Sequence, residues 1–90
     1  MEQLHYAIHP QVAFREVEGE MFIVTPDNRF HNLVDPVSVS IWRACDGTPR
    51  TEADLTAMVV ATFRVDEATA RADLAAFLAN AVKLHLLVAS

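Results

Sequence analysis

Polar and apolar residues alternate along the first third of the chain, a pattern typical of β-strands. Residues 12–17 carry Val, Phe and Val with polar residues between them, and residues 20–25 are largely apolar and β-branched. Glu and Gly at positions 18–19 form a two-residue turn, so the two segments are predicted to be a hairpin. Turn-forming Pro, Asp and Asn occupy residues 26–28, and residues 29–34 are then predicted to be a third strand.

Two helix starts follow the predicted sheet. Asp35 is suited to cap a first helix, with Pro36 at the first helical position, where a missing backbone N–H costs nothing. Gly47 ends that helix, because glycine readily adopts the left-handed conformation that closes a helix. Thr51 and Asp54 form a capping-box-like pair at the start of a second helix.

A third helix is predicted from about Asp66, a suitable N-cap, to about Leu84, after a link at residues 63–65. The segment 86–88 is expected either to cover the end of the core or to continue the helix. Helical spacing on the first two helices predicts the buried residues Val37, Ile41, Ala44 and Cys45, flanked by Val39 and Trp42, and then Leu55, Met58, Val59 and Thr62 or Phe63.

The third helix carries an apolar stripe that is wider than one packing contact requires. One row runs through Ala70, Leu74, Phe77, Ala81 and Leu84, and a second row runs through Ala75, Leu78 and Val82. This width indicates two contacts, one with the core and one with a partner. The alternative is that the large residues of both rows are all core beneath the sheet.

These elements predict an α+β fold, in which a three-stranded antiparallel sheet is followed by three helices in a winged-helix-like arrangement. The 90 residues, 52% hydrophobic and 21% charged, suit a single domain over residues 1–90, with a core at about 9–87. No internal repeat or low-complexity segment interrupts the chain.

The order of the local motifs resembles the PqqD family over about residues 9–87. The shared motifs are an Asp-Pro helix start, a Trp on the first helix, Asp-Gly before a Thr-initiated second helix, and Asp73-Leu74 with Phe77-Leu78 on the third. The chain departs from the family pattern at residues 85–87, where His-Leu-Leu replaces a common Gly-Leu ending, and at Val34, where Leu is more usual.

The resemblance implies a peptide-binding domain, also called a RiPP recognition element, which holds the leader segment of a ribosomally made precursor peptide. It implies that this chain is not an enzyme and carries no cofactor. The second partner that it implies is a modifying enzyme, often of the radical S-adenosylmethionine class, to which the bound precursor is presented.

The third strand is then expected to be a sheet edge, where an extended peptide can add as a further strand. A groove between this strand and the third helix would select the peptide side chains. Arg29 and Arg71 are expected to pair with acidic leader residues or to be solvated surface residues. The predicted peptide-binding residues are Arg29, Phe30, His31, Asn32, Leu33, Arg71, Leu74, Ala75, Leu78 and Val82.

The charge distribution argues against nucleic-acid binding. The net charge is −5 and the seven Lys and Arg residues are scattered, whereas nucleic-acid binders concentrate positive charge on one face. An acidic surface would also repel a strongly acidic peptide unless the local arginines dominate the contact. Two alternatives stay open: a winged-helix nucleic-acid-binding regulator, and a dimerisation module that pairs or exchanges edge strands.

The sequence carries no sign of export or membrane insertion. Residues 1–5 lack the basic start and the long apolar stretch of a signal peptide, and no apolar run approaches the ~20 residues of a membrane span. Cys45 is the one cysteine, which excludes an internal disulfide and fits a small buried thiol. We therefore expect a soluble, cytoplasmic protein.

Neither a catalytic site nor a metal site is predicted. His5 and His9 are four residues apart, but Pro10 follows at once and no third ligand is near, so a frayed terminus is expected there. Ser38 lacks a paired base. The aspartates at the three helix starts are explained as caps, and Trp42 as a core residue.

Overall fold

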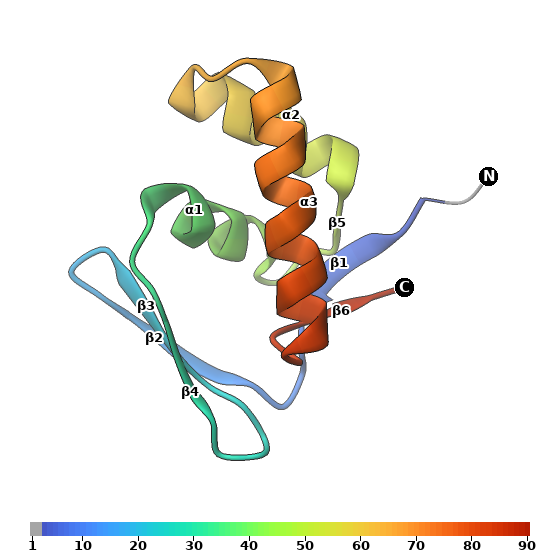
Figure 1. Ribbon diagram of the computed structural model, residues 1–90. Helices are drawn as coiled ribbons and strands as arrows, with labels where there is room; N and C mark the ends of the chain where they lie inside the picture. Colours follow the sequence, from blue (N-terminus) through green and yellow to red (C-terminus); the bar gives the residue numbers. More distant parts are fainter. Residues whose placement is uncertain (1–2) are drawn as a thin grey trace.

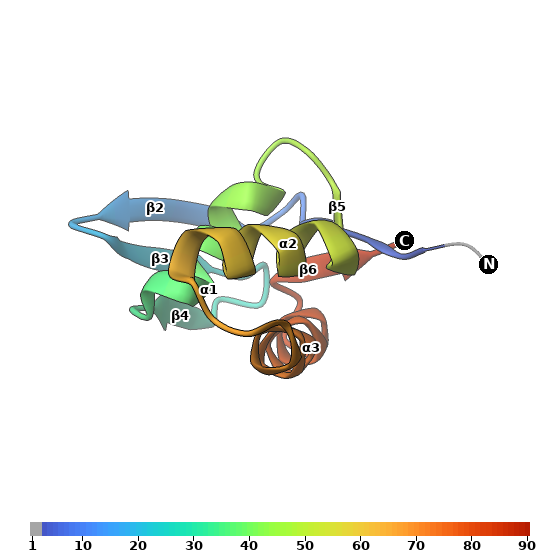
Figure 2. The same ribbon diagram turned by 90° about the horizontal axis from the view of Figure 1, so that it is seen from above.

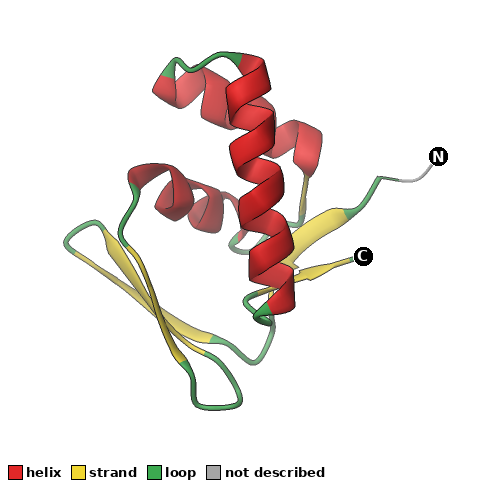
Figure 3. Cartoon of the chain, in the orientation of Figure 1, coloured by secondary structure: helices red, strands yellow, loops and turns green. Residues whose placement is uncertain are grey.

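The predicted sheet and the three predicted helices are present in the computed structural model, which describes residues 3–90. Residues 1–2, which belong to the segment 1–5 considered in the sequence analysis, lie outside this range. An antiparallel sheet, which we call the wing sheet, has the order β2-β3-β4 (Figure 1, Figure 3). Its strands and the three helices are β2 (Ala13–Val17), β3 (Glu20–Val24), β4 (Phe30–Leu33), α1 (Pro36–Cys45), α2 (Glu52–Phe63) and α3 (Glu67–Lys83). The α+β fold, with a three-stranded antiparallel sheet and then three helices, is confirmed.

A second small sheet was not predicted from the sequence. It has the order β5-β1-β6 and consists of β1 (His5–Ile8), β5 (Arg50–Thr51) and β6 (Leu87–Ala89). The expectation of a frayed terminus at His5 is therefore wrong, because its backbone N–H donates to the carbonyl of Ser90 at 2.8 Å. The tail at residues 86–88 covers the core as a strand and does not continue the helix, so the two described ends of the chain lie side by side (Figure 1).

The wing sheet has the register that its turns dictate. Glu18 and Gly19 both adopt positive φ, at 52° and 83°, as a two-residue hairpin turn requires. Gly19 takes this conformation without steric cost, because it has no Cβ. The second turn uses Asn28 at φ 63°, after which β4 pairs antiparallel with β3. Both turns were predicted from their residue types.

All three helix starts are capped by the residues that the sequence predicts. The Asp35 carboxylate accepts from the Ser38 backbone N–H at 3.1 Å, and Asp66 accepts from that of Thr69 at 3.0 Å. Thr51 and Asp54 form a complete capping box, each accepting from the other's backbone N–H. Hydrogen bonds from Thr51, above all from its backbone N–H, hold the pKa of Asp54 below its usual range.

The capping box gives a first testable prediction. Replacing Thr51 by alanine is expected to lower the free energy of unfolding by about 1 kcal/mol, because the backbone N–H of Asp54 then loses its acceptor. Urea unfolding followed by circular dichroism measures the change. Thr48→Ala, in the exposed loop before β5, is the matched control and is expected to unfold like the original chain. Equal midpoints for all three proteins would contradict the capping role.

The core lies between the three helices and the inner face of the wing sheet. Trp42 is fully buried, as predicted, and its ring meets Phe14 of β2 edge-on with centroids 5.4 Å apart. On α1 the predicted face is slightly rotated, since Val39 and Trp42 are buried whereas Val37 and Ala44 are half-buried. Cys45 is buried as well, and its desolvation raises the pKa of the thiol to about 11, so this cysteine is unreactive at neutral pH.

Candidate functional site

Strand β4 has an open outer edge. Within residues 3–90 it pairs with β3 alone, in the register Met21↔Leu33 to Val24↔Phe30. The Thr25 backbone N–H donates to the Arg29 carbonyl at 2.9 Å, so the backbones of these two residues face each other as in a hydrogen-bonded pair. Because such pairs alternate in an antiparallel ladder, His31 and Leu33 direct their backbone groups toward β3. Phe30 and Asn32 therefore direct their N–H and C=O groups outward.

The side chains of β4 divide between the two faces of the wing sheet. His31 and Leu33 are half-buried and lie on the same face as the core residues Met21 and Ile23, with which they pair. Phe30 points to the opposite face, where it is 63% exposed and packs against Phe22 with ring centroids 5.9 Å apart. The open backbone edge thus separates an apolar inner side from an exposed outer side.

A groove lies between the inner side of β4 and the second half of α3. Figure 2 shows β4 as the strand of the wing sheet nearest to α3. The cavity has a volume of about 230 Å³. The residues of this β4–α3 groove are His31, Asn32, Leu33, Ser38, Phe77, Asn80, Ala81, Leu84 and Leu86. An apolar floor with a few polar side chains at its rim is typical of a site that binds an extended peptide or a small ligand.

A second cavity, the α1–α3 pocket, continues the groove along α3. It also has a volume of about 230 Å³ and shares Ser38 and Phe77 with the β4–α3 groove. Its residues are Asp35, Val37, Ser38, Ile41, Val59, Val65, Ala70, Asp73, Leu74 and Phe77. One face of α3, from Ala70 to Leu84, therefore borders two adjoining cavities.

His31 holds an unsatisfied polar atom in the wall of the groove. Its Nε2 atom is buried and has no hydrogen-bond partner within residues 3–90. Buried polar side-chain atoms are bonded in most proteins, and an unbonded one carries a desolvation penalty of about 1–3 kcal/mol.

None of the predicted residues of α3 lines the β4–α3 groove. Leu78 is a core residue at 2% exposure, and Ala75 and Val82 line neither cavity. Leu74 is also buried and contributes only to the wall of the α1–α3 pocket. The groove is lined instead by Phe77, Ala81 and Leu84, which belong to the other apolar row noted in the sequence, and by Asn80, which the sequence analysis did not consider. Helical spacing therefore indicated two apolar rows on α3 but did not show which row faces β4.

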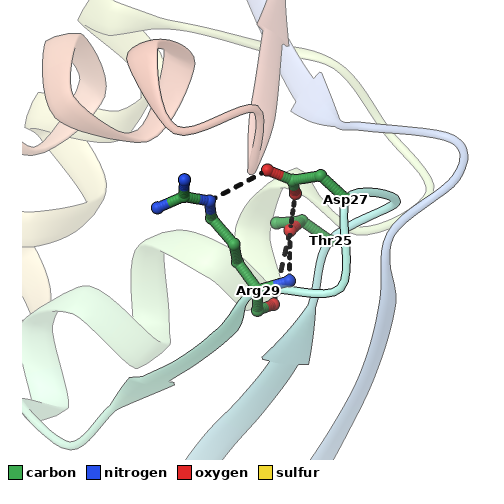
Figure 4. A network of polar contacts seen from close by, with 3 residues as sticks. All are labelled: Thr25, Asp27 and Arg29. Atoms are coloured by element: carbon green, nitrogen blue, oxygen red, sulfur yellow. Dashed lines mark hydrogen bonds and ion pairs between the residues drawn. The ribbon is translucent and has the colours of Figure 1, made fainter.

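The two predicted arginines are engaged away from the groove. Figure 4 shows Arg29 beside Asp27 in the β3–β4 turn, with Nε 3.1 Å from the carboxylate and both side chains largely exposed. Hydrogen bonding from the Thr25 hydroxyl, first, and the nearby Arg29 charge hold the pKa of Asp27 below its usual range. Arg71 lies 3.4 Å from Glu67 and lines another cavity, of about 440 Å³, beside α2 and the start of β1. Neither guanidinium lines the groove.

Residues 3–90 contain no group of three or more His, Cys, Asp or Glu side chains arranged to hold a metal ion. In the same range no helix is long and apolar enough to cross a bilayer.

Comparison with known proteins assigns the family. The family model described as coenzyme PQQ synthesis protein D (PqqD) matches residues 20–87. The chain belongs to the PqqD family. The match begins at β3 and ends in β6, so it contains both walls of the β4–α3 groove.

The fold is shared with a protein whose structure was solved in complex with a peptide. The structure of TbiB1 in complex with the TbiA(beta) leader peptide aligns with a TM-score of 0.79 at 21% sequence identity, over 90% of this chain and 93% of that chain. The comparison with curated proteins gives no match. The PqqD-like resemblance seen in the sequence is thus confirmed for both family and fold.

Proposed function

We propose that this protein is a non-catalytic binding domain for the leader segment of a ribosomally synthesised precursor peptide. The observation that carries the proposal is the open edge of β4 beside the β4–α3 groove. Membership of the PqqD family supports it, as does the similarity in fold to TbiB1, whose structure contains a leader peptide. The function of the domain is to present the bound precursor to a modifying enzyme.

The leader binds by adding a strand to the wing sheet. Its backbone exchanges hydrogen bonds with the outward groups of Phe30 and Asn32, each contributing about 0.5–1.5 kcal/mol net. Alternate leader side chains then point into the β4–α3 groove, where they contact Leu33, Phe77 and Leu84. Backbone bonds give affinity for many sequences, and the groove gives selectivity.

The partner enzyme performs the chemistry. By analogy with the family, it belongs to the radical S-adenosylmethionine class, and this domain holds no cofactor for it. The bound leader raises the local concentration of the precursor at the enzyme, so a domain without catalytic residues can increase the rate of modification.

The open edge of β4 also favours a second candidate function, homodimerisation. In this role β4 pairs with a second copy of the chain. A homodimer through β4 would occupy the backbone groups that the leader needs. Sedimentation with and without peptide separates the two roles, because a dimer that uses this edge dissociates as the peptide binds.

A binding titration tests the proposed function. We expect overlapping synthetic 15-residue peptides that tile the short reading frames neighbouring this gene to include at least one binder, with Kd at or below about 10 μM, or about −7 kcal/mol. Isothermal titration measures the affinity, and a scrambled peptide of the same composition is the control. Amide chemical shifts are expected to change at residues 30–33 and 77–84. Absence of binding by every tile at several hundred micromolar would contradict the proposal.

A further inference from the structure

We propose that the α1–α3 pocket receives a basic side chain, lysine or arginine, of the same leader peptide. This inference rests on the proposed function and adds the chemical class of one leader residue. It is carried by the shape of the pocket, by the charges on its rim and by its continuity with the β4–α3 groove.

The walls of the pocket suit a long aliphatic stem. Ile41, Val59 and Leu74 form buried parts of the lining, and Phe77 and Val65 are half-buried beside them. Lysine and arginine place their methylene stems on such apolar surface while the charged head stays at a polar rim. A cavity of about 230 Å³ has room for one side chain of this size.

The rim of the pocket carries negative charge that no cation of residues 3–90 pairs with. Asp35 and Asp73 both line the pocket, and neither takes part in an ion pair within residues 3–90. Three of the seven Lys and Arg residues are paired elsewhere, and the chain has a net charge of −5. The leader residue in this pocket is thus expected to be basic. In the sequence analysis, Arg29 and Arg71 had suggested acidic leader residues instead.

A peptide on β4 can reach the pocket. The β4–α3 groove extends over α3 from Phe77 to Leu84, and the α1–α3 pocket extends from Ala70 to Phe77. Each stretch is about 10 Å long at 1.5 Å per helical residue. Side chains on one face of a strand recur about every 7 Å, so a basic residue two or four positions from the residue in the groove lies within reach.

The test compares two single-charge changes on α3. Asp73→Asn removes a carboxylate at the pocket rim, and Glu67→Gln removes one at the other side of the helix, beside Arg71. Both residues are exposed and neither caps a helix, so both variants are expected to fold. Asp35 is left unchanged because it caps α1. The probes are fluorescein-labelled forms of the 15-residue precursor tiles, measured by fluorescence anisotropy.

We expect the best-binding tile to bind about fivefold more weakly to Asp73→Asn than to the original chain, and with unchanged affinity to Glu67→Gln. Changing one Lys or Arg of that tile to Gln is expected to produce the same loss. The two losses should not add, because each removes the same ion pair. Asp73→Lys should restore binding to the tile in which this basic residue is changed to Glu.

The outcomes distinguish this inference from the proposed function. One outcome is a tile that binds through β4 but keeps its affinity when each of its basic residues is changed. This outcome would overturn the basic subsite and leave the leader-binding role intact. Equal losses of affinity for Asp73→Asn and Glu67→Gln would also overturn the basic subsite, because they would show only a general effect of the protein's charge. If no tile binds, the proposed function fails and the inference fails with it.

Discussion

A Leu78→Arg variant is expected to be unfolded at neutral pH and room temperature. Leu78 is only 2% exposed, within the core formed by α3 and its neighbours. Truncating such a leucine to alanine typically costs about 2–5 kcal/mol, and a buried guanidinium adds the penalty of an uncompensated charge. The sum approaches the ~5–15 kcal/mol that stabilises a typical domain. Circular dichroism and thermal melting measure the loss.

The neighbouring residue on α3 supplies the control. Ala79 is exposed, so Ala79→Arg is expected to keep the fold and the melting temperature to within a few degrees. A folded Leu78→Arg protein that lost only its affinity for the precursor tiles would contradict the placement of Leu78 in the core. It would instead support the sequence-based prediction that this residue contacts the peptide.

Replacing Asn32 by proline is expected to weaken leader binding strongly while the domain stays folded. The Asn32 backbone N–H faces outward, so proline removes a donor of the open edge without breaking a hydrogen bond to β3. The proline ring also obstructs an added strand. We expect affinity for the best tile to fall at least about tenfold, or 1.4 kcal/mol, in isothermal titration.

A proline one residue earlier gives the opposite pattern. The His31 N–H faces β3, and His31→Pro is therefore expected to lower the free energy of unfolding by breaking the ladder with Ile23. If Asn32→Pro kept full affinity, the leader would not bind by strand addition at β4. Equal destabilisation by the two prolines would show that the alternation of backbone groups along β4 is not as described.

The features that local sequence determines were predicted well. Asp35, Thr51 and Asp66 cap the helices because each needs only a backbone N–H three residues away. The two hairpin turns follow from residues that tolerate positive φ. Interactions that close within three or four residues leave few alternatives, so residue type and spacing were sufficient to predict them.

The features that depend on distant parts of the chain were missed or misplaced. The small β5-β1-β6 sheet joins segments from both ends and the middle of the chain, and β5 has only two residues, too few to show an alternating pattern. The position of β4 at the sheet edge could be predicted because it follows from strand order. The groove residues on α3 could not, because two apolar rows were equally suited to face the sheet and only the packed structure turns one toward β4.

The single tryptophan of the chain is enclosed by the core and lies edge-on to Phe14, away from both cavities. Its indole emission consequently responds to solvent entering the interior and not to occupancy of β4. In every variant described above, the same cuvette can therefore report the folded fraction from the indole while a dye on the peptide reports occupancy. A loss of affinity is then separable from a loss of fold without a second preparation.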